Sequence, residues 1–461
     1  MTLLLIARRA LLGLALAYGC GAAGSAMAQG QAVSPGELRE LAVKALDAGY
    51  PATALDMTSA LLRRDPQDVQ TLLIRSRAAR DTGDHPLARA TARQAWDLSA
   101  TDDRVRYSAA LAMAQALSSE GKRTRAQIWL RRAAQIAPDA QTKSRAVRDF
   151  RYVRSRNRWT TELNFNLAPK SNINNGSSRS TVTLLVFDQP IEVPLPGATR
   201  ALSGLEYSGG LSTRFRLAET TRRATDLTFS ARYTTYTLSG SAQAAAPGTQ
   251  GSDFALGTVY GGLSHKWLTQ SGRAEYTIAG AFGRSWYGGQ AYGNHSNLSA
   301  GVNMAFGKRD RLGVTFSADL TRGPAAPHAD AFAVSLRHTH RTRSGAMLGV
   351  WTSATRSQSD IPTADFTDFA AGIDFAPRIL VMGAQPRFGI GLRSRDYPFS
   401  AYAPGYRTDF EQNAWIDLTF KKIDYYGFHP TVRMQLARPD SNINLFDVDR
   451  SGISFGITSA Y

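Results

Sequence analysis

The chain has 461 residues, of which 43% are hydrophobic and 20% charged, and its formal net charge is +17. This apolar content excludes a disordered tail protein, and the single cysteine excludes a disulfide scaffold. Beyond the N-terminal segment, no stretch approaches the ~18 consecutive apolar residues of a membrane helix, which excludes a helical transporter. An outer-membrane β-barrel is compatible with the composition, because its apolar residues alternate with polar ones.

Residues 1–28 are predicted to be a signal peptide. Arg8 and Arg9 form a short positive region, an apolar run follows, and Ala26-Met27-Ala28 supplies the small-x-small cleavage pattern. Lipid modification at Cys20 is the rival interpretation, but the residues before this cysteine match that pattern poorly. Cleavage after the signal leaves a chain without cysteine, which suits the oxidising periplasm.

Residues 29–158 are predicted to form a periplasmic domain of tetratricopeptide-like helical repeats. The segment is rich in Ala, Leu, Arg and Gln and has few β-branched residues. Similar segments open at Gly49, Gly83 and Gly121, which are 34 and 38 residues apart. The shorter spacing, 34 residues, is the period of the tetratricopeptide helix-turn-helix unit.

The repeats are predicted to pack through small and turn-forming residues. Alanines fall where paired helices must approach closely, and glycine and proline mark the turns. These positions are Gly49, Ala54, Pro66, Gly83, Ala88, Gly121, Ala126 and Pro138. A stack of such repeats forms a groove whose usual cargo is a peptide or a protein. A plain helical spacer is the alternative interpretation.

The end of the helical segment is strongly basic. Six arginines occupy its last fourteen residues: Arg145, Arg148, Arg151, Arg154, Arg156 and Arg158. Nucleic acid is the usual partner of such a run, but an exported protein meets little of it, so no nucleic-acid partner is predicted. Contact with anionic lipid headgroups or with an acidic client fits the location better, and a solvated face is an equal alternative.

From Trp159 onward the hydrophobic period changes to two, which predicts a 14-stranded antiparallel outer-membrane β-barrel over residues 159–461. Leu312, Val314 and Phe316, for example, alternate with polar or small residues, as lipid-facing and lumen-facing positions do. The strands are predicted to begin near Thr160, Gly204, Thr225, Phe254, Arg273, His295, Arg311, Phe332, Ala346, Thr367, Gln385, Gln412, Phe428 and Ser451.

The predicted connections alternate between long and short. Long polar or Pro-rich connections include residues 168–203, 287–294 and 439–450, and short ones include residues 218–224. Outer-membrane barrels have long extracellular loops and short periplasmic turns. An even number of strands places both ends of the barrel at the short-turn side, so the helical domain is predicted to lie in the periplasm.

The sequence offers little sign of chemistry. His338 and His340 lie on one side of a predicted strand, at a spacing that suits a metal ion. They share that side with apolar residues, which favours a pair at the membrane interface. No local motif singles out a Ser-His or Asp-His arrangement. We therefore predict a non-enzyme with no catalytic residue, cofactor or metal.

A tetrapeptide occurs twice, once after the first predicted strand and once before the last. The residues are Ser171, Asn172, Ile173 and Asn174, followed by Asn175, and then Ser441, Asn442, Ile443 and Asn444. Closure of the barrel makes the first and last strands neighbours, so both motifs are predicted at the extracellular rim of one seam. Asx-type turns that pin two loops are one interpretation. A gate at the seam is the other.

The segments around both tetrapeptides resemble those of a known family. Asn164–Asn175 (NFNLAPKSNINN) and Pro439–Arg450 (PDSNINLFDVDR) are similar to the first-strand and terminal patterns of surface lipoprotein assembly modifiers, the Slam-type outer-membrane translocators. The resemblance extends over almost the whole mature chain, because these proteins join periplasmic tetratricopeptide-like repeats to a fourteen-stranded barrel. It implies export of a protein across the outer membrane.

The predicted function is therefore protein translocation in the outer membrane. The repeats would capture a client in the periplasm, either a surface lipoprotein or a soluble haem- or metal-acquisition protein, and the barrel would pass it outward. Other expected partners are outer-membrane lipids, and the barrel assembly machinery and periplasmic chaperones that insert the barrel. The alternatives are an exopolysaccharide export barrel and a passive porin.

Overall fold

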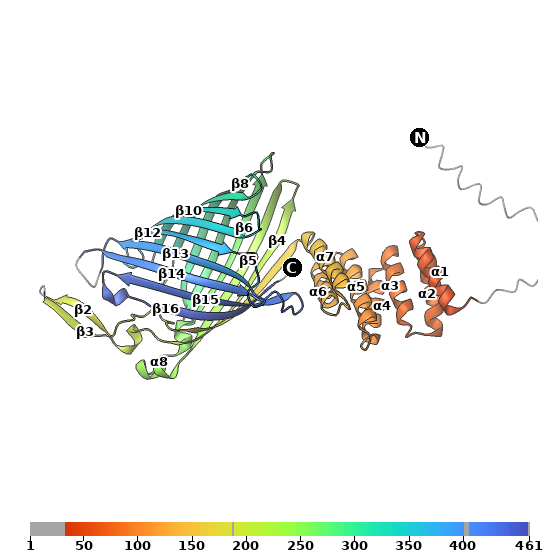
Figure 1. Ribbon diagram of the computed structural model, residues 1–461, viewed down its shortest axis with the longest axis horizontal. Helices are drawn as coiled ribbons and strands as arrows, with labels where there is room; N and C mark the ends of the chain where they lie inside the picture. The colour runs from red at the N-terminus through yellow and green to blue at the C-terminus, as the bar shows by residue number, and fades with distance from the viewer. Residues whose placement is uncertain (1–32, 187–188, 401–404, 460–461) are drawn as a thin grey trace, which may run out of the picture. The chain divides into compact units, whose positions relative to one another are not determined.

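The computed structural model describes residues 33–186, 189–400 and 405–459. The predicted signal peptide, residues 1–28, lies outside this described part. The described residues separate into two compact units, which are divided between Leu98 and Ser99. The last three helices of the predicted repeat region therefore belong to the same unit as the strands (Figure 1).

The described residues between Pro35 and Ser155 form seven α-helices. These are α1 (Pro35–Asp47), α2 (Pro51–Arg64), α3 (Val69–Thr82), α4 (His85–Leu98), α5 (Asp103–Ser119), α6 (Arg123–Gln135) and α7 (Ala140–Ser155). Short polar side chains begin several of them: Ser34, Asp68, Asp102 and Asp139 accept hydrogen bonds from the first free N–H groups of their helices. No helix of the described residues is long and apolar enough to cross a membrane.

The repeat positions lie at the turns and contacts of helix pairs. Gly49, Gly83 and Gly121 follow α1, α3 and α5 with φ of +83°, +88° and +83°, a left-handed conformation that glycine adopts without strain. Alanines at 54, 88 and 126, in the second helix of each pair, are fully buried. The prolines at 66 and 138 lie in the connections after α2 and α6.

The strands confirm the predicted barrel. Fourteen of them close in the order β1-β16-β15-β14-β13-β12-β11-β10-β9-β8-β7-β6-β5-β4, and all neighbouring pairs are antiparallel. Their bounds are β1 (Trp159–Lys170), β4 (Gly204–Glu219), β5 (Arg223–Leu238), β6 (Leu256–Leu268), β7 (Ala274–Tyr287), β8 (Gln290–Phe306), β9 (Asp310–Arg322), β10 (Ala329–Arg341), β11 (Met347–Ser359), β12 (Phe366–Ala376), β13 (Gln385–Tyr397), β14 (Arg407–Thr419), β15 (Phe428–Ser441) and β16 (Arg450–Ser459).

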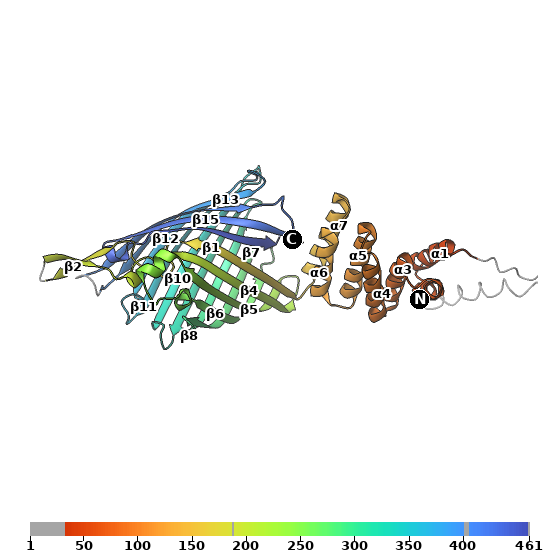
Figure 2. The ribbon, with the colours of Figure 1, turned by 90° about the horizontal axis from the view of Figure 1, so that it is seen from below.

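The connections differ at the two ends of the barrel. One end carries a separate hairpin of β2 (Thr181–Val186) and β3 (Gln189–Pro194), the helix α8 (Gly240–Ala245), and the 3-10 turns η1 (Gly197–Thr199), η2 (Gly251–Phe254) and η3 (Asn444–Phe446). The hairpin extends beyond the strand ends in both ribbon views (Figures 1 and 2). The other end carries six short connections, together with the start of β1 and the end of β16.

One predicted loop is wrong. Residues 287–294 were expected to form a long connection, but β7 runs to Tyr287 and β8 starts at Gln290. Only Gly288 and Gly289 join them, with φ of +54° and +81°. Two consecutive left-handed glycines make the tight hairpin turn whose twist matches that of the strands, so the flanking residues remain in the sheet.

The two faces of the barrel wall have opposite character. Apolar side chains cover the outer face, where Leu298 is 61% exposed and Ile390 is 63% exposed. Polar and charged residues alternate with them on the inner face. A closed sheet leaves no unpaired edge, and an apolar exterior around a polar interior is the arrangement that a lipid bilayer stabilises. The fold is that of an outer-membrane β-barrel.

Candidate functional site: the barrel wall and its seam

Ion pairs between strands line the inner wall. The Asp374 carboxylate on β12 accepts hydrogen bonds from Arg337 on β10 and, at 3.0 Å, from Arg387 on β13. Asp368, also on β12, accepts from Arg393 at 2.5 Å and Arg395 at 3.1 Å. Charge-assisted bonds of Asp374 therefore connect β12 to β13 and, across β11, to β10, whereas those of Asp368 connect β12 to β13.

The same pattern recurs elsewhere around the lumen. Asp226 on β5 lies between Arg214 and Arg216 of β4. On β14, Asp417 makes a bidentate pair with Arg433 of β15, at 2.5 and 2.6 Å. Charged groups need water or charged partners, so these pairs indicate a hydrated lumen with charges held in fixed positions.

The seam between the first and last strands is closed by few paired residues. The β1–β16 ladder of the described residues joins three pairs, Asn166–Gly456, Leu167–Phe455 and Lys170–Gly452. On its other side, β1 pairs with β4 at every residue from Trp159 to Lys170. Pro169 contributes to the gap in the seam, because proline has no backbone N–H to donate.

A cavity of about 320 Å³ lies beside the unpaired part of this seam. Its lining includes Phe165 and Ile457, which belong to the apolar outer face of β1 and β16. It also includes Asn166 and Thr458, which belong to the polar inner face. Residues of β1, β14, β15 and β16 thus border one cavity at this corner of the wall.

The first tetrapeptide holds its own loop together. The Asn172 side chain accepts a hydrogen bond from the Gly176 amide at 3.1 Å and donates to the carbonyl of the same residue at 2.8 Å. Asn174 donates to the carbonyls of Ala198 and Arg200, at 2.9 Å each, and accepts from the Leu202 amide. These are the backbone contacts that the turn interpretation of the motif describes.

The second tetrapeptide attaches its loop to two other segments. Asn442 accepts from the Thr408 amide at 2.9 Å and donates to the Tyr406 carbonyl at 3.0 Å. Asn444 donates to the Thr183 hydroxyl at 3.3 Å. Ile173 and Ile443, the apolar residues of the two tetrapeptides, are 7% and 6% exposed. Both motifs therefore act as loop anchors at the long-loop end.

The structure brings the two tetrapeptides to the same seam. The Ser171 hydroxyl accepts from the Ser451 amide at 3.0 Å, which joins the end of β1 to the start of β16. Asn175 has a φ of +53° and lines a second cavity, of about 310 Å³, with Arg407 and Phe446. The sites assigned to the seam thus cluster at one corner of the barrel end.

Sequence reasoning missed the residues that connect the two loops. Asp447 accepts two hydrogen bonds from the Arg179 guanidinium, at 3.0 and 2.9 Å, and one from the Ser441 amide at 2.9 Å. Ser178 accepts from the Asp449 amide at 2.6 Å. Their one sequence signal is the position of both aspartates, three and five residues after the second tetrapeptide.

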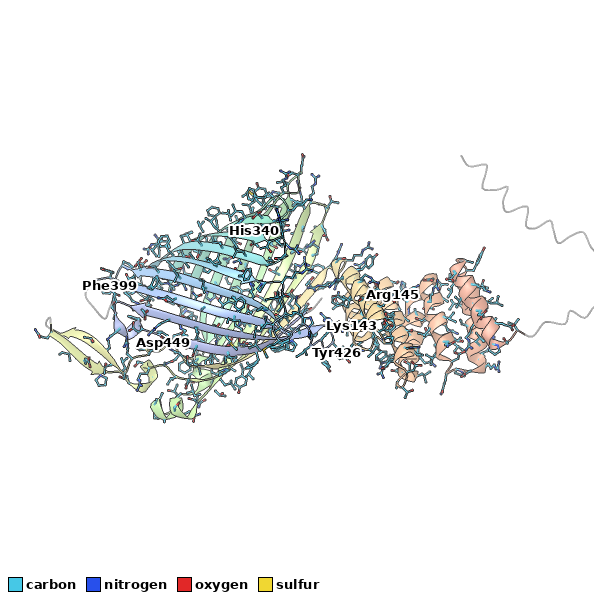
Figure 3. The ribbon with its side chains drawn as sticks, in the orientation of Figure 1. Lys143, Arg145, His340, Phe399, Tyr426 and Asp449 are labelled. Carbon is cyan, nitrogen blue, oxygen red and sulfur yellow. The ribbon has the colours of Figure 1, made fainter. Side chains whose placement is uncertain are left out.

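Within the second unit, α6 and α7 contact the turn between β14 and β15. Arg131 of α6 donates to the carbonyls of Tyr426 and Gly427 at 2.8 and 3.0 Å, and to the Ser459 hydroxyl at 2.8 Å. Lys143 of α7 pairs with Asp424 at 2.9 Å; Figure 3 labels Lys143 and Tyr426. Because Ser459 belongs to β16, this contact reaches one strand of the seam.

The two candidate histidines meet a third residue. His338 and His340 lie on the outer face of β10, and both contact Asp310 of β9, at 3.2 and 2.7 Å. In the described part of the chain, no group of three or more His, Cys, Asp or Glu side chains has an arrangement that holds a metal ion. The aspartate was not singled out from the sequence, because it lies 28 residues before the first histidine.

Comparison with known proteins gives no family. No family model and no curated protein matches the chain. Among solved structures, the helical part is similar to the first TPR domain of the human RPAP3 protein, with 17% identity over 26% of this chain and 92% of the other, and a TM-score of 0.23. The strands are similar to a BenF-like porin from Pseudomonas fluorescens Pf-5, with 6% identity over 65% and 98% and a TM-score of 0.36.

A bacterial polysaccharide outer membrane secretin is a further similar structure, with 7% identity over 65% of this chain and 98% of the other. Its TM-score is 0.34. With scores this low, the assignment of the barrel rests on the strand order and pairing of this chain.

Proposed function

We propose that this protein transports a client protein across the outer membrane, and that the β1–β16 seam opens during transport. The observation that carries the proposal is the short seam ladder, which joins only three residue pairs of the described β1 and β16. The other strand pairs of the barrel have longer ladders than β1 and β16, so they offer no comparable point of opening. The helical repeats in the same chain supply a surface of the kind that binds peptides or proteins.

Opening at this seam has a low energetic cost. A backbone hydrogen bond contributes about 1 kcal/mol net in water and several times that in an apolar medium, so the strand pair with the fewest bonds separates first. Gly452 and Gly456 also carry no side chain that packs across the seam. The other strand pairs, held by long ladders and by arginine–aspartate pairs, would remain a rigid wall.

In this proposal the helices lie in the periplasm and capture the client before transport. The free energy comes from folding of the client outside, because hydrophobic burial there prevents its return. The resemblance of Asn164–Asn175 and Pro439–Arg450 to surface lipoprotein assembly modifiers favours a surface lipoprotein or a soluble haem- or metal-acquisition protein as the client. The Arg131 contact with Ser459 offers a route from the helices to the seam.

The test locks the seam with a disulfide. Lys170 and Gly452 are direct partners across β1 and β16, and a side chain at Gly452 meets no atom closer than 3.5 Å. The variant Lys170→Cys/Gly452→Cys therefore forms a cross-link without strain at that glycine. Surface proteins of whole cells are identified by protease shaving and mass spectrometry, in cells with the wild type, with the variant, and without the protein.

The expected result is that at least one surface protein depends on the wild type, disappears with the oxidised variant, and returns after reduction. A matched control, Ser208→Cys/Thr234→Cys, cross-links the complete β4–β5 ladder and should leave surface display unchanged. Normal display by the locked variant would contradict seam opening. Steady conductance in planar bilayers, with no surface protein dependent on the chain, would instead indicate a passive porin.

A further inference from the structure

Basic residues gather at one end of the barrel. The short-turn rim, defined as residues 219–223, 268–273, 307–311, 341–346, 377–384 and 420–427, comprises the six short connections and the strand residues that flank them. Every one of these turns carries at least one lysine or arginine. The eleven cations are Arg222, Arg223, Arg273, Lys308, Arg309, Arg311, Arg341, Arg343, Arg378, Lys421 and Lys422, and all of them are exposed.

The acidic residues of the same rim do not neutralise these cations. The rim contains Glu219, Asp310 and Asp424. Glu219 pairs with Arg216, and Asp424 pairs with Lys143. Asp310 contacts two histidines. Across the described residues, none of the eleven rim cations lies within salt-bridge distance of a carboxylate.

The connections at the long-loop end, counted without the flanking strand residues, have the opposite sign. Their described residues, within 171–203, 239–255, 323–328, 360–365, 398–406 and 442–449, include two arginines and six acidic residues. The acidic residues are Glu192, Asp253, Asp360, Asp365, Asp447 and Asp449. Figure 3 labels Asp449 and Phe399 at this end and His340 toward the other. The charge difference therefore runs along the barrel axis.

Aromatic side chains on the outer face place the rim at the membrane surface. Trp267 stacks on Tyr276 with ring centroids 5.4 Å apart, and Trp159 lies 4.8 Å from Phe215. Arg223 is the direct strand partner of Trp267. Tryptophan and tyrosine prefer the headgroup level of a bilayer, so the rim cations next to them lie at the height of the lipid phosphates.

We propose that the short-turn rim binds anionic phospholipid headgroups of the leaflet at that end of the barrel. Guanidinium and ammonium groups pair with phosphates by charge-assisted hydrogen bonds. No carboxylate of the described residues pairs with the eleven cations, and clustered lysines and arginines next to a membrane segment attract anionic lipid. The rim thereby fixes the depth and the orientation of the barrel in the bilayer.

The distribution of the cations favours lipid over an acidic protein. All six turns contribute, so the positive charge surrounds the whole circumference of a closed barrel. A bilayer surrounds a barrel in the same way. A protein partner would contact only part of this circumference, so its binding would not explain the cations of the remaining turns. This proposal depends on the barrel fold and is independent of what the barrel transports.

The test measures lipid binding by the full chain in detergent micelles. The protein is mixed with phosphatidylglycerol or phosphatidylcholine of the same acyl chains, and retained lipid is counted by native mass spectrometry. We expect phosphatidylglycerol to be retained at least about tenfold better, since each cation near an anionic surface adds to the attraction. Raising the salt concentration should weaken this preference, because surface charges are screened.

Two matched variants separate the rim from general charge. Lys308→Gln/Arg309→Gln/Lys421→Gln/Lys422→Gln removes four rim cations and should lower the preference for phosphatidylglycerol severalfold. Arg63→Gln/Arg64→Gln/Arg104→Gln/Arg125→Gln removes four exposed helical cations and should leave it unchanged. Equal retention of both lipids by the wild type overturns the proposal without any variant. An equal loss in both variants overturns it too, and would point to the general charge of the chain.

Discussion

The Asp374 carboxylate accepts a hydrogen bond from the Arg387 guanidinium at 3.0 Å, on the lumen side of the barrel wall. The same carboxylate binds Arg337 from another strand, and its side chain is 9% exposed. Three strands are thus joined through one residue. Bonds of this kind stabilise the wall away from the seam, where few backbone pairs close the barrel.

Replacing Asp374 by asparagine should destabilise the barrel. Asparagine keeps the shape but loses the charge, and hydrogen bonds to charged groups contribute about 1.5–3 kcal/mol each. We expect a loss of about 2 kcal/mol in the free energy of unfolding, because both arginines are partly exposed and regain water. Urea unfolding, followed by the mobility of folded and unfolded barrel on gels, measures it. Asp360→Asn, at an exposed loop position, should have no effect.

Arg131 offers a test of the contact between α6 and the β14–β15 turn. Arg131→Gln removes the guanidinium that donates to Tyr426, Gly427 and Ser459 and that lies 4.4 Å from the Phe428 ring centre. Hydrogen exchange in residues 421–428 should become faster, since these carbonyls lose their partner.

The neighbouring Arg132 supplies the matched control. Its guanidinium lies over the Trp129 ring at 4.5 Å, within α6 itself. Arg132→Gln removes the same charge from the same helix and should leave exchange in the turn unchanged. Equal acceleration by both substitutions would show that the loss of positive charge, and not the Arg131 contact, holds the turn.

The first unit should lose stability in acid through Asp68. Although partial burial raises it, the hydrogen bonds from Thr71 and Arg39 hold the pKa of Asp68 below its ordinary value of 3.8. A lowered pKa means that the ionised carboxylate stabilises the fold above pH 3.8, and that this contribution disappears as the pH falls through the folded-state pKa. Asp68→Asn should therefore cost about 1 kcal/mol at neutral pH and nothing in strong acid.

Hydrogen exchange in α3 across the pH range measures this difference between wild type and variant. Asp56→Asn, at an exposed position of α2, is the control and should show no dependence on pH. A difference at position 68 that persists at the lowest pH would mean that shape, and not ionisation, accounts for the role of the aspartate.

The repeat turns can be tested with a pair of glycines. Gly83→Ala places a side chain at φ +88°, a left-handed conformation that costs other residues about 1–2 kcal/mol. Gly36 lies in the first turn of α1, where an added Cβ meets only the Ser34 hydroxyl at 3.9 Å. Gly36→Ala should stabilise α1 slightly, because alanine favours helix. Chemical denaturation followed by helical circular dichroism should show opposite signs for the two substitutions.

Much of the fold could be predicted because its signals are local. The helical repeat is visible in the spacing of Gly49, Gly83 and Gly121, and each of these glycines ends a helix in the left-handed conformation. The barrel is visible in the alternation of apolar and polar residues, which is a property of each strand alone. The error at Gly288-Gly289 arose because a glycine pair signals a turn but does not report the length of the loop.

The site depended more on tertiary structure. The sequence indicated that the two tetrapeptides lie near one seam, but not that Asp447 and Arg179 connect their loops. It also did not reveal which arginines pair with Asp374, because many arginines occupy lumen-facing positions of the strands.

By itself, the sequence determined the order and type of the elements: helical repeats first, then fourteen strands with an apolar outer face. Those properties follow from periodicity and turn chemistry, which act over a few residues. Only the tertiary structure decided how many pairs close β1 against β16 and which turns gather the unpaired cations. Strand register and the meeting of distant loops depend on closure of the whole barrel, and closure is a property of all its strands together.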